Sequence, residues 1–94
     1  MSQWNRTLLE AADAGNTAKS QQTLEKGANL NATDKDGWPP LHLAAFNGRK
    51  DTAECLVFNG ARLDTENSFG KTALDVADND EIRSILTAAR WRCQ

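Results

Sequence analysis

The sequence predicts an all-α protein in which short helix-turn-helix units stack into a solenoid and β-turn or hairpin loops join the units. Three observations predict it: the chain repeats at an interval of 33 residues, the recurring residues are mostly leucine, alanine and glycine, and glycines and prolines mark the unit ends. The residues that align under this shift include Leu8, Leu41 and Leu74; Ala11, Ala44 and Ala77; Gly15 and Gly48; Gly27 and Gly60; and Gly37 and Gly70. Because packed helical repeats need small and apolar side chains, we interpret the period as structural.

The middle unit shows the expected elements most clearly. Residues 34–37, Asp-Lys-Asp-Gly, predict a turn, because aspartate bonds to the local backbone and glycine permits a positive φ. The pair Pro39-Pro40 suits the first turn of a helix, where no N–H is needed, and residues 41–45 continue that helix. Gly48 ends it as a left-handed cap, and a second helix is expected over residues 51–58, whose apolar residues recur every three or four positions.

The middle unit resembles an ankyrin repeat. The resemblance rests on the turn at residues 34–37, the run Pro-Leu-His-Leu-Ala-Ala at residues 40–45, Gly48, and the Gly-Ala pair at residues 60–61. The family's usual motif is Thr-Pro-Leu-His, and here Pro39 replaces the threonine, which removes a hydroxyl that helps tie the turn to the histidine. Period, motif and glycine positions agree together, and the resemblance covers nearly the whole chain. It implies a solenoid that binds other proteins.

The outer units depart from the pattern as terminal repeats do. We expect one domain over residues 1–94, divided into an N-capping repeat (1–33), an internal repeat (34–66) and a shortened C-capping repeat with a tail (67–94). The first unit's second helix, expected at about residues 18–26, is polar, and the last unit lacks about three residues before its second helix. Three repeats are about the minimum for a stable stack, so we predict marginal stability, with Leu41 and Leu74 central to the core.

The sequence offers no catalytic or metal-binding constellation. His42, the only histidine, lies in the repeat motif, which implies that a ring nitrogen bonds turn backbone within or between repeats. Cys55 and Cys93 show no paired metal-ligand spacing, and Cys55 is expected to act as a small buried hydrophobe. No glycine-rich phosphate loop is present. We therefore predict a non-enzyme without metal or cofactor.

Composition restricts the classes of partner and the cellular compartments that the sequence allows. The net charge of −2 lacks the basic excess of a nucleic-acid binder. No signal peptide or membrane-spanning run is present, and two widely spaced cysteines are typical of a reducing compartment. We expect a cytoplasmic protein, with the nucleus as the alternative, that binds another protein and neither nucleic acid nor a membrane. A monomer is favoured.

The ankyrin resemblance implies a binding surface at the turn tips and the exposed side of the first helices. Aromatic residues there have the composition of an interface hot spot. Carried over position by position, the expected protein-binding residues are Lys35, Asp36, Trp38, Phe46, Asn47, Ser68, Phe69 and Lys71. Trp4 is expected to cover the end of the stack. Phe58 is open to three interpretations: a second contact, a dimer contact, or a residue covered by the tail around Trp91.

Two functions of different classes remain after these exclusions. The first is a non-catalytic interaction module, acting as an adaptor, scaffold or inhibitor. The second is a regulatory or targeting domain of a larger enzyme or multidomain protein, which the length of the full open reading frame would decide. A stand-alone enzyme is disfavoured because no constellation of side chains supports it.

Overall fold

The computed structural model describes residues 3–92, with side chains up to residue 89. Its helices form one pair in each of the three predicted units, and residues 3–92 contain no strand. The helices are α1 (Gln3–Ala14), α2 (Thr17–Glu25), α3 (Pro40–Phe46), α4 (Lys50–Phe58), α5 (Ala73–Val76) and α6 (Asp80–Arg92). This order confirms the predicted all-α stack.

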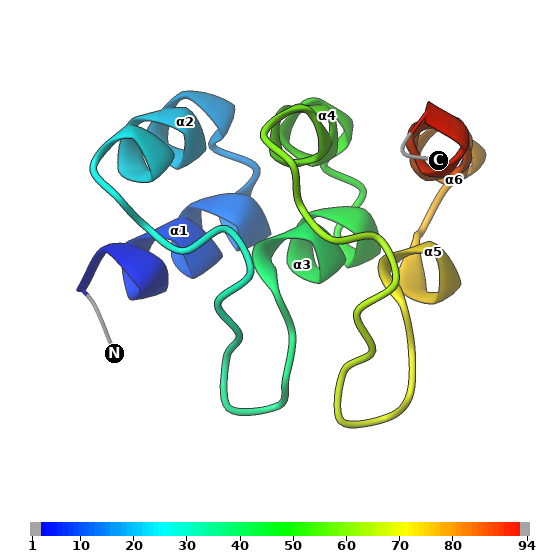
Figure 1. The fold of residues 1–94 in the computed structure, drawn as a ribbon, viewed down its shortest axis with the longest axis horizontal. Coiled ribbons are helices and arrows are strands. Elements are labelled where there is room, and N and C mark those ends of the chain that lie inside the picture. Colours follow the sequence, from blue (N-terminus) through cyan, green and yellow to red (C-terminus); the bar gives the residue numbers. More distant parts are fainter. Residues whose placement is uncertain (1–2, 93–94) are drawn as a thin grey trace.

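The helices lie in two layers (Figure 1). One row holds α1, α3 and α5, the other holds α2, α4 and α6, and the loops before α3 and α5 project away from the second row. The main contacts join the two helices of each unit and the matching helices of neighbouring units. Each unit therefore packs on its sequence neighbour, which is the defining feature of a solenoid.

Local chemistry decides where the helices begin and end. Pro40 is the first residue of α3, and Gly48 follows this helix with a φ of 70°, as the sequence predicted. Thr72 and Asp75 form a capping box at the start of α5. At the start of α6, the Oδ1 atom of Asn79 accepts a backbone N–H at 2.9 Å, a cap that the sequence analysis missed.

The core lies between the two layers and consists mainly of leucine, isoleucine and alanine. Its largest buried apolar side chains are those of Leu8, Leu41, Leu56 and Ile82. Leu74, predicted to be central to the core, packs against the core but is only half-buried. The reason is its place at the end of the row, since no helix of the described chain covers the outer side of α5.

The length of the last unit and the burial of Cys55 were also predicted from the sequence. The shortening of the last unit is confirmed, because α5 spans 4 residues where α3 spans 7. Cys55 is half-buried rather than buried, since it faces the polar helix α2, where its thiol donates to Oε1 of Gln21 at 3.3 Å. Partial burial raises the pKa of this thiol, so it is protonated at neutral pH.

Candidate protein-binding surface

Two turns of the same design carry the candidate surface: the first turn (residues 34–38) and the second turn (residues 67–71). In the first turn, Oδ1 of Asp34 accepts the backbone N–H groups of residues 36 and 38, both at 2.9 Å. In the second, Oδ1 of Asn67 accepts those of residues 69 and 71, at 2.9 and 3.1 Å. The two side chains thus hold the backbone in the same way, 33 residues apart. The turns differ in one respect: Nδ2 of Asn67 is buried without a hydrogen-bond partner.

The two turns contact each other directly. The backbone N–H of Ser68 donates to the backbone oxygen of Asp36 at 3.1 Å. Gly37 has a φ of 79°, and a β-carbon at this position would lie 3.1 Å from the backbone nitrogen of Ser68. Glycine is required here by both the backbone conformation and the close approach. The contact fixes the turns as one surface.

His42 ties α3 to the second turn. Its side chain is buried, and its Nε2–H donates to the backbone oxygen of Lys71 at 2.8 Å. Burial lowers the pKa of His42, and the backbone hydrogen bonds to Lys71 and Thr65 and the charge of Asp75 oppose only part of this effect. The ring is neutral at neutral pH, and its predicted structural role between repeats is confirmed.

Trp38 connects the first turn to α3 through its ring. The Trp38 and Phe46 ring centroids lie 5.4 Å apart with the planes at 77°, and those of Trp38 and His42 lie 6.0 Å apart at 74°. Both are edge-to-face pairs, the arrangement that aromatic quadrupoles favour. Trp38 is half-buried, whereas Phe46 is 55% exposed and Phe69, on the second turn, is 69% exposed. The Trp38 and Phe46 rings therefore hold each other in place, while the two phenylalanines stay open to solvent.

A hollow of about 340 Å³, here called the turn hollow, lies among the turns, α1 and α3. Its lining residues are Asp13, Asp34, Asp36, Trp38, Leu43, Phe46, Asn47 and Phe69. Five of the eight predicted residues therefore lie together in one hollow. The other three, Lys35, Ser68 and Lys71, are exposed on the same turns but do not line it.

Three residues of the turn hollow were not predicted as binding residues from the sequence: Asp13, Asp34 and Leu43. The repeat itself carries the signal for Asp13, because this residue stands 33 positions before Phe46 and so belongs to the same row. The structure links the two units here, since Nδ2 of Asn47 donates to Oδ1 of Asp13 at 2.7 Å and to the backbone oxygen of Leu43 at 2.9 Å. Asp34 was identified only as a turn former.

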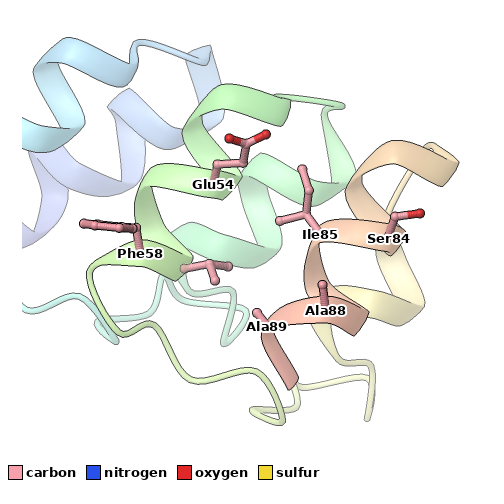
Figure 2. Close-up of a pocket in the computed structure, with 7 residues that line it drawn as sticks. Glu54, Phe58, Ser84, Ile85, Ala88 and Ala89 are labelled. Atoms are coloured by element: carbon pink, nitrogen blue, oxygen red, sulfur yellow. The ribbon is translucent and has the colours of Figure 1, made fainter. Parts of the chain in front are cut away.

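A second concavity, the helix groove, lies on the other layer between α4 and α6. It has a volume of about 600 Å³ and is lined by Glu54, Val57, Phe58, Ser84, Ile85, Ala88 and Ala89. Figure 2 shows Phe58 on the side of the groove farthest from α6, with its ring pointing away from that helix. Phe58 is 92% exposed, so no described part of the chain covers its ring. The suggested cover, the Trp91 side chain, lies outside the described side chains.

Trp4 stands apart from both concavities, at the N-terminal end of the stack. It is 36% exposed, and Nζ of Lys26 lies 5.3 Å from the centre of its ring, in cation–π geometry. Trp4 therefore packs locally against the end of α2.

The described chain offers neither a metal-ion cluster nor a membrane-spanning helix. Residues 3–92 contain no group of three or more histidine, cysteine, aspartate or glutamate side chains placed to hold a metal ion. Within the same residues, no helix has both the length and the apolar character that crossing a bilayer requires.

Comparison with known proteins gives a consistent result. The family model for ankyrin repeats matches three copies over residues 8–90. Protein phosphatase 1 regulatory subunit 12A of Mus musculus is 44% identical over 73 residues, which cover 78% of this chain and 7% of that protein. Protein fem-1 homolog C of Xenopus laevis is 42% identical over 63 residues, or 67% of this chain and 10% of that protein. Protein phosphatase 1 regulatory subunit 27 of Mus musculus is 36% identical over 73 residues, or 78% and 47%. The chain thus spans less than half the length of each relative.

Proposed function

Because the chain belongs to the ankyrin-repeat family, we propose that it is a non-catalytic module that binds a partner protein through the turn hollow and the turn tips beside it. The observation that carries the proposal is the meeting of three aromatic side chains, Trp38, Phe46 and Phe69, in one concavity. Aromatic residues in a concave, partly desolvated site are the usual carriers of binding energy at protein interfaces. An adaptor, a scaffold and an inhibitor would all use such a surface.

The hydrogen bonds around the turn hollow support this proposal. Trp38 is fixed through its backbone by Asp34 and through its ring by Phe46. Phe69 is fixed through its backbone by Asn67. A surface that is ordered before binding loses less conformational entropy when the partner arrives. The names of two relatives, both regulatory subunits of protein phosphatase 1, also favour an interaction role over a catalytic one.

The test is affinity capture from a native cell extract, followed by protein identification. The immobilised baits are the unaltered chain, the double variant Trp38→Ala/Phe46→Ala, and the control variant Phe58→Ala, which alters an exposed ring on the helix groove. Circular dichroism and thermal melting establish that each bait is folded. We expect partners that the unaltered chain and Phe58→Ala retain and that the folded double variant loses. Equal capture by all three baits would show that the turn hollow is not the binding site.

The relative lengths favour a second candidate: a targeting or regulatory segment within a larger protein. The chain covers only 7% and 10% of two of its relatives, so ankyrin repeats of this kind occur there as small parts of long chains. Sequencing the complete transcript tests this candidate. A reading frame that continues into a catalytic domain would support it, whereas a frame of 94 codons would rule it out.

A further inference from the structure

Three carboxylates share the turn hollow with the three aromatic rings. Asp34 and Asp36 come from the first turn, and Asp13 comes from the end of α1. None of the described residues that line the hollow is basic. The hollow therefore combines exposed aromatic rings with negative charge. The turn tips beside it carry positive charge as well, because Lys35 and Lys71 are exposed on the same turns.

These three carboxylates have no cationic partner closer than 4 Å among the side chains that the structure describes. In the described residues, the ion pairs closer than 4 Å lie elsewhere: Arg6 with Glu10 at 3.6 Å, and Lys50 with Glu81 at 3.2 Å. Arg49 approaches Asp13, but its Nε–H donates to the backbone oxygen at 3.3 Å rather than to the carboxylate. The negative charge of the hollow is thus available to a ligand.

The hydrogen bonds of the carboxylates leave room for such a ligand. Oδ1 of Asp34 is occupied by two backbone N–H groups, and Oδ1 of Asp13 by Asn47, so each has its second oxygen without a recorded partner. The Asp36 carboxylate is exposed and has no recorded partner in the described chain. Carboxylate oxygens accept strong charge-assisted hydrogen bonds from guanidinium and ammonium groups.

The aromatic rings select for the same chemistry. The faces of Trp and Phe carry negative quadrupole charge and attract a cation placed over the ring. Trp38 and Phe46 are set edge to face, at 77°, so the two ring faces point in different directions around the hollow. Phe46 and Phe69 are both more than half exposed, which keeps their surfaces accessible. The aliphatic stem of a long basic side chain would pack on Leu43 and these rings.

We infer that the turn hollow binds a basic side chain, arginine or lysine, presented by an extended segment of the partner protein. This inference rests on the proposed function and specifies the partner's chemistry at that surface. The cationic head meets the carboxylates of Asp34, Asp36 and Asp13, and the stem lies against the aromatic rings. The volume of about 340 Å³ suits one side chain rather than a folded element.

The test begins with random peptides displayed on phage and selected on the immobilised 94-residue chain. Phage that also bind the Trp38→Ala/Phe46→Ala variant are removed, so that the survivors depend on the turn hollow. The selected peptides are synthesised with a fluorophore, and their dissociation constants are measured by anisotropy at two salt concentrations. We expect one position to be arginine or lysine in nearly all of them. Replacing that residue with citrulline or norleucine, which are neutral and of similar shape, should weaken binding about tenfold.

Charge variants of the protein complete the experiment. Asp36→Asn should weaken the basic peptides several-fold and reduce the salt dependence of binding, because one attracting charge is lost. Glu54→Gln is the matched control: it neutralises a carboxylate that lines the helix groove, and it should leave peptide binding unchanged.

The outcomes separate this inference from the proposed function. Peptides that depend on Trp38 and Phe46 but carry no basic residue, or whose neutral analogues bind equally well, would overturn the basic-side-chain inference and leave the proposed surface standing. An Asp36→Asn variant that binds the basic peptides as tightly as the unaltered chain would also overturn it. If removing the phage that bind the Trp38→Ala/Phe46→Ala variant leaves no binders, although phage bound the unaltered chain before that step, the proposed surface itself is wrong.

Discussion

The turn hollow and the helix groove are both concave, but they differ in what lines them. The helix groove is the larger, at about 600 Å³ against about 340 Å³, yet its lining is mostly aliphatic, and Glu54 is the one charged group among its described lining residues. The turn hollow is smaller and holds three aromatic rings and three carboxylates. Backbone and side-chain hydrogen bonds fix the turn hollow, whereas Phe58 on the groove stands 92% exposed and points away from α6.

The larger volume of the helix groove does not by itself indicate a binding site. Packing two helices with small residues such as Ala88 and Ala89 leaves space between them as a by-product. The turn hollow instead combines aromatic rings and carboxylates on a backbone fixed by Asp34 and Asn67, which is the combination that the proposed binding site requires. The variants below test whether the two concavities differ in stability, rigidity and sensitivity to pH as this interpretation requires.

The largest effect is expected from the core that supports both concavities. Leu41 is almost fully buried between the layers, so Leu41→Ala removes apolar contacts and leaves a cavity. We expect a loss of about 2–5 kcal/mol in the free energy of unfolding, measured by urea denaturation. Leu74→Ala is the comparison variant and should cost less, because Leu74 is half-buried. An unchanged midpoint for Leu41→Ala would contradict the core assignment.

The second turn offers a stabilising change. Asn67→Asp keeps the Oδ1 acceptor for two backbone N–H groups and removes the buried Nδ2 donor that has no partner. We expect the free energy of unfolding to rise by about 1 kcal/mol, since an unsatisfied buried donor is lost. The reciprocal variant Asp34→Asn should lower it. If Asn67→Asp is destabilising, the cost of burying the carboxylate exceeds the benefit, and the two turns are not equivalent.

The aromatic pair of the turn hollow should be energetically coupled. A double-mutant cycle over Trp38→Ala and Phe46→Ala should give a coupling free energy of about 0.5–1.5 kcal/mol, because their rings meet edge to face at 5.4 Å. The same cycle over Trp38→Ala and Phe58→Ala serves as a control and should give none, since no ring contact joins these two residues within the described chain. Equal coupling free energies in both cycles would show that the contact between the Trp38 and Phe46 rings does not hold them in place.

Acid should weaken the turn side of the molecule through His42. Burial lowers the pKa of this residue in the folded state, so between that pKa and the unfolded value near 6.5 the unfolded chain binds more protons. The contribution of the neutral ring is therefore complete above pH 6.5 and is lost as pH falls through the folded pKa. Urea denaturation at pH 7.5 and pH 5.5 should show a smaller free energy of unfolding at the lower pH, and His42→Gln should reduce that difference. If the free energy of unfolding differs between the two pH values by the same amount in His42→Gln, other titratable groups cause the difference.

The smallest effect is expected on the helix groove. Phe58→Ser replaces a ring that is 92% exposed, so the free energy of unfolding should change by no more than about 0.5 kcal/mol. Thermal melting provides the measurement. A large loss of stability would mean that Phe58 packs against something in solution, such as a second copy of the chain, and the oligomeric state would then be measured by sedimentation.

Much of the fold could be predicted from the sequence, because the repeated residues mark turns, helix starts and helix ends through local backbone preferences. The turn at residues 34–37, the proline start of α3 and the glycine after it each follow from backbone preferences within a few residues. The Asn79 cap of α6 was missed because its neighbours Asp78 and Asp80 offered equally suitable caps. The half-burial of Leu74 was also missed, since the repeat period gives equal weight to inner and outer units.

By itself, the sequence determined the repeated units and the buried role of Leu41, because each depends on spacing within one unit or on the register between units. The aromatic residues of the candidate surface were carried over from the resemblance to ankyrin repeats. Only the tertiary structure decided which of those residues share one concavity. It brought Asp13 from α1 and Phe69 from the second turn beside Trp38 and Phe46, and it left Lys35 and Lys71 outside. Stacking sets these distances, because each turn is placed by contacts with the next unit, such as the bond from His42 to Lys71, and such contacts join residues that no local pattern relates.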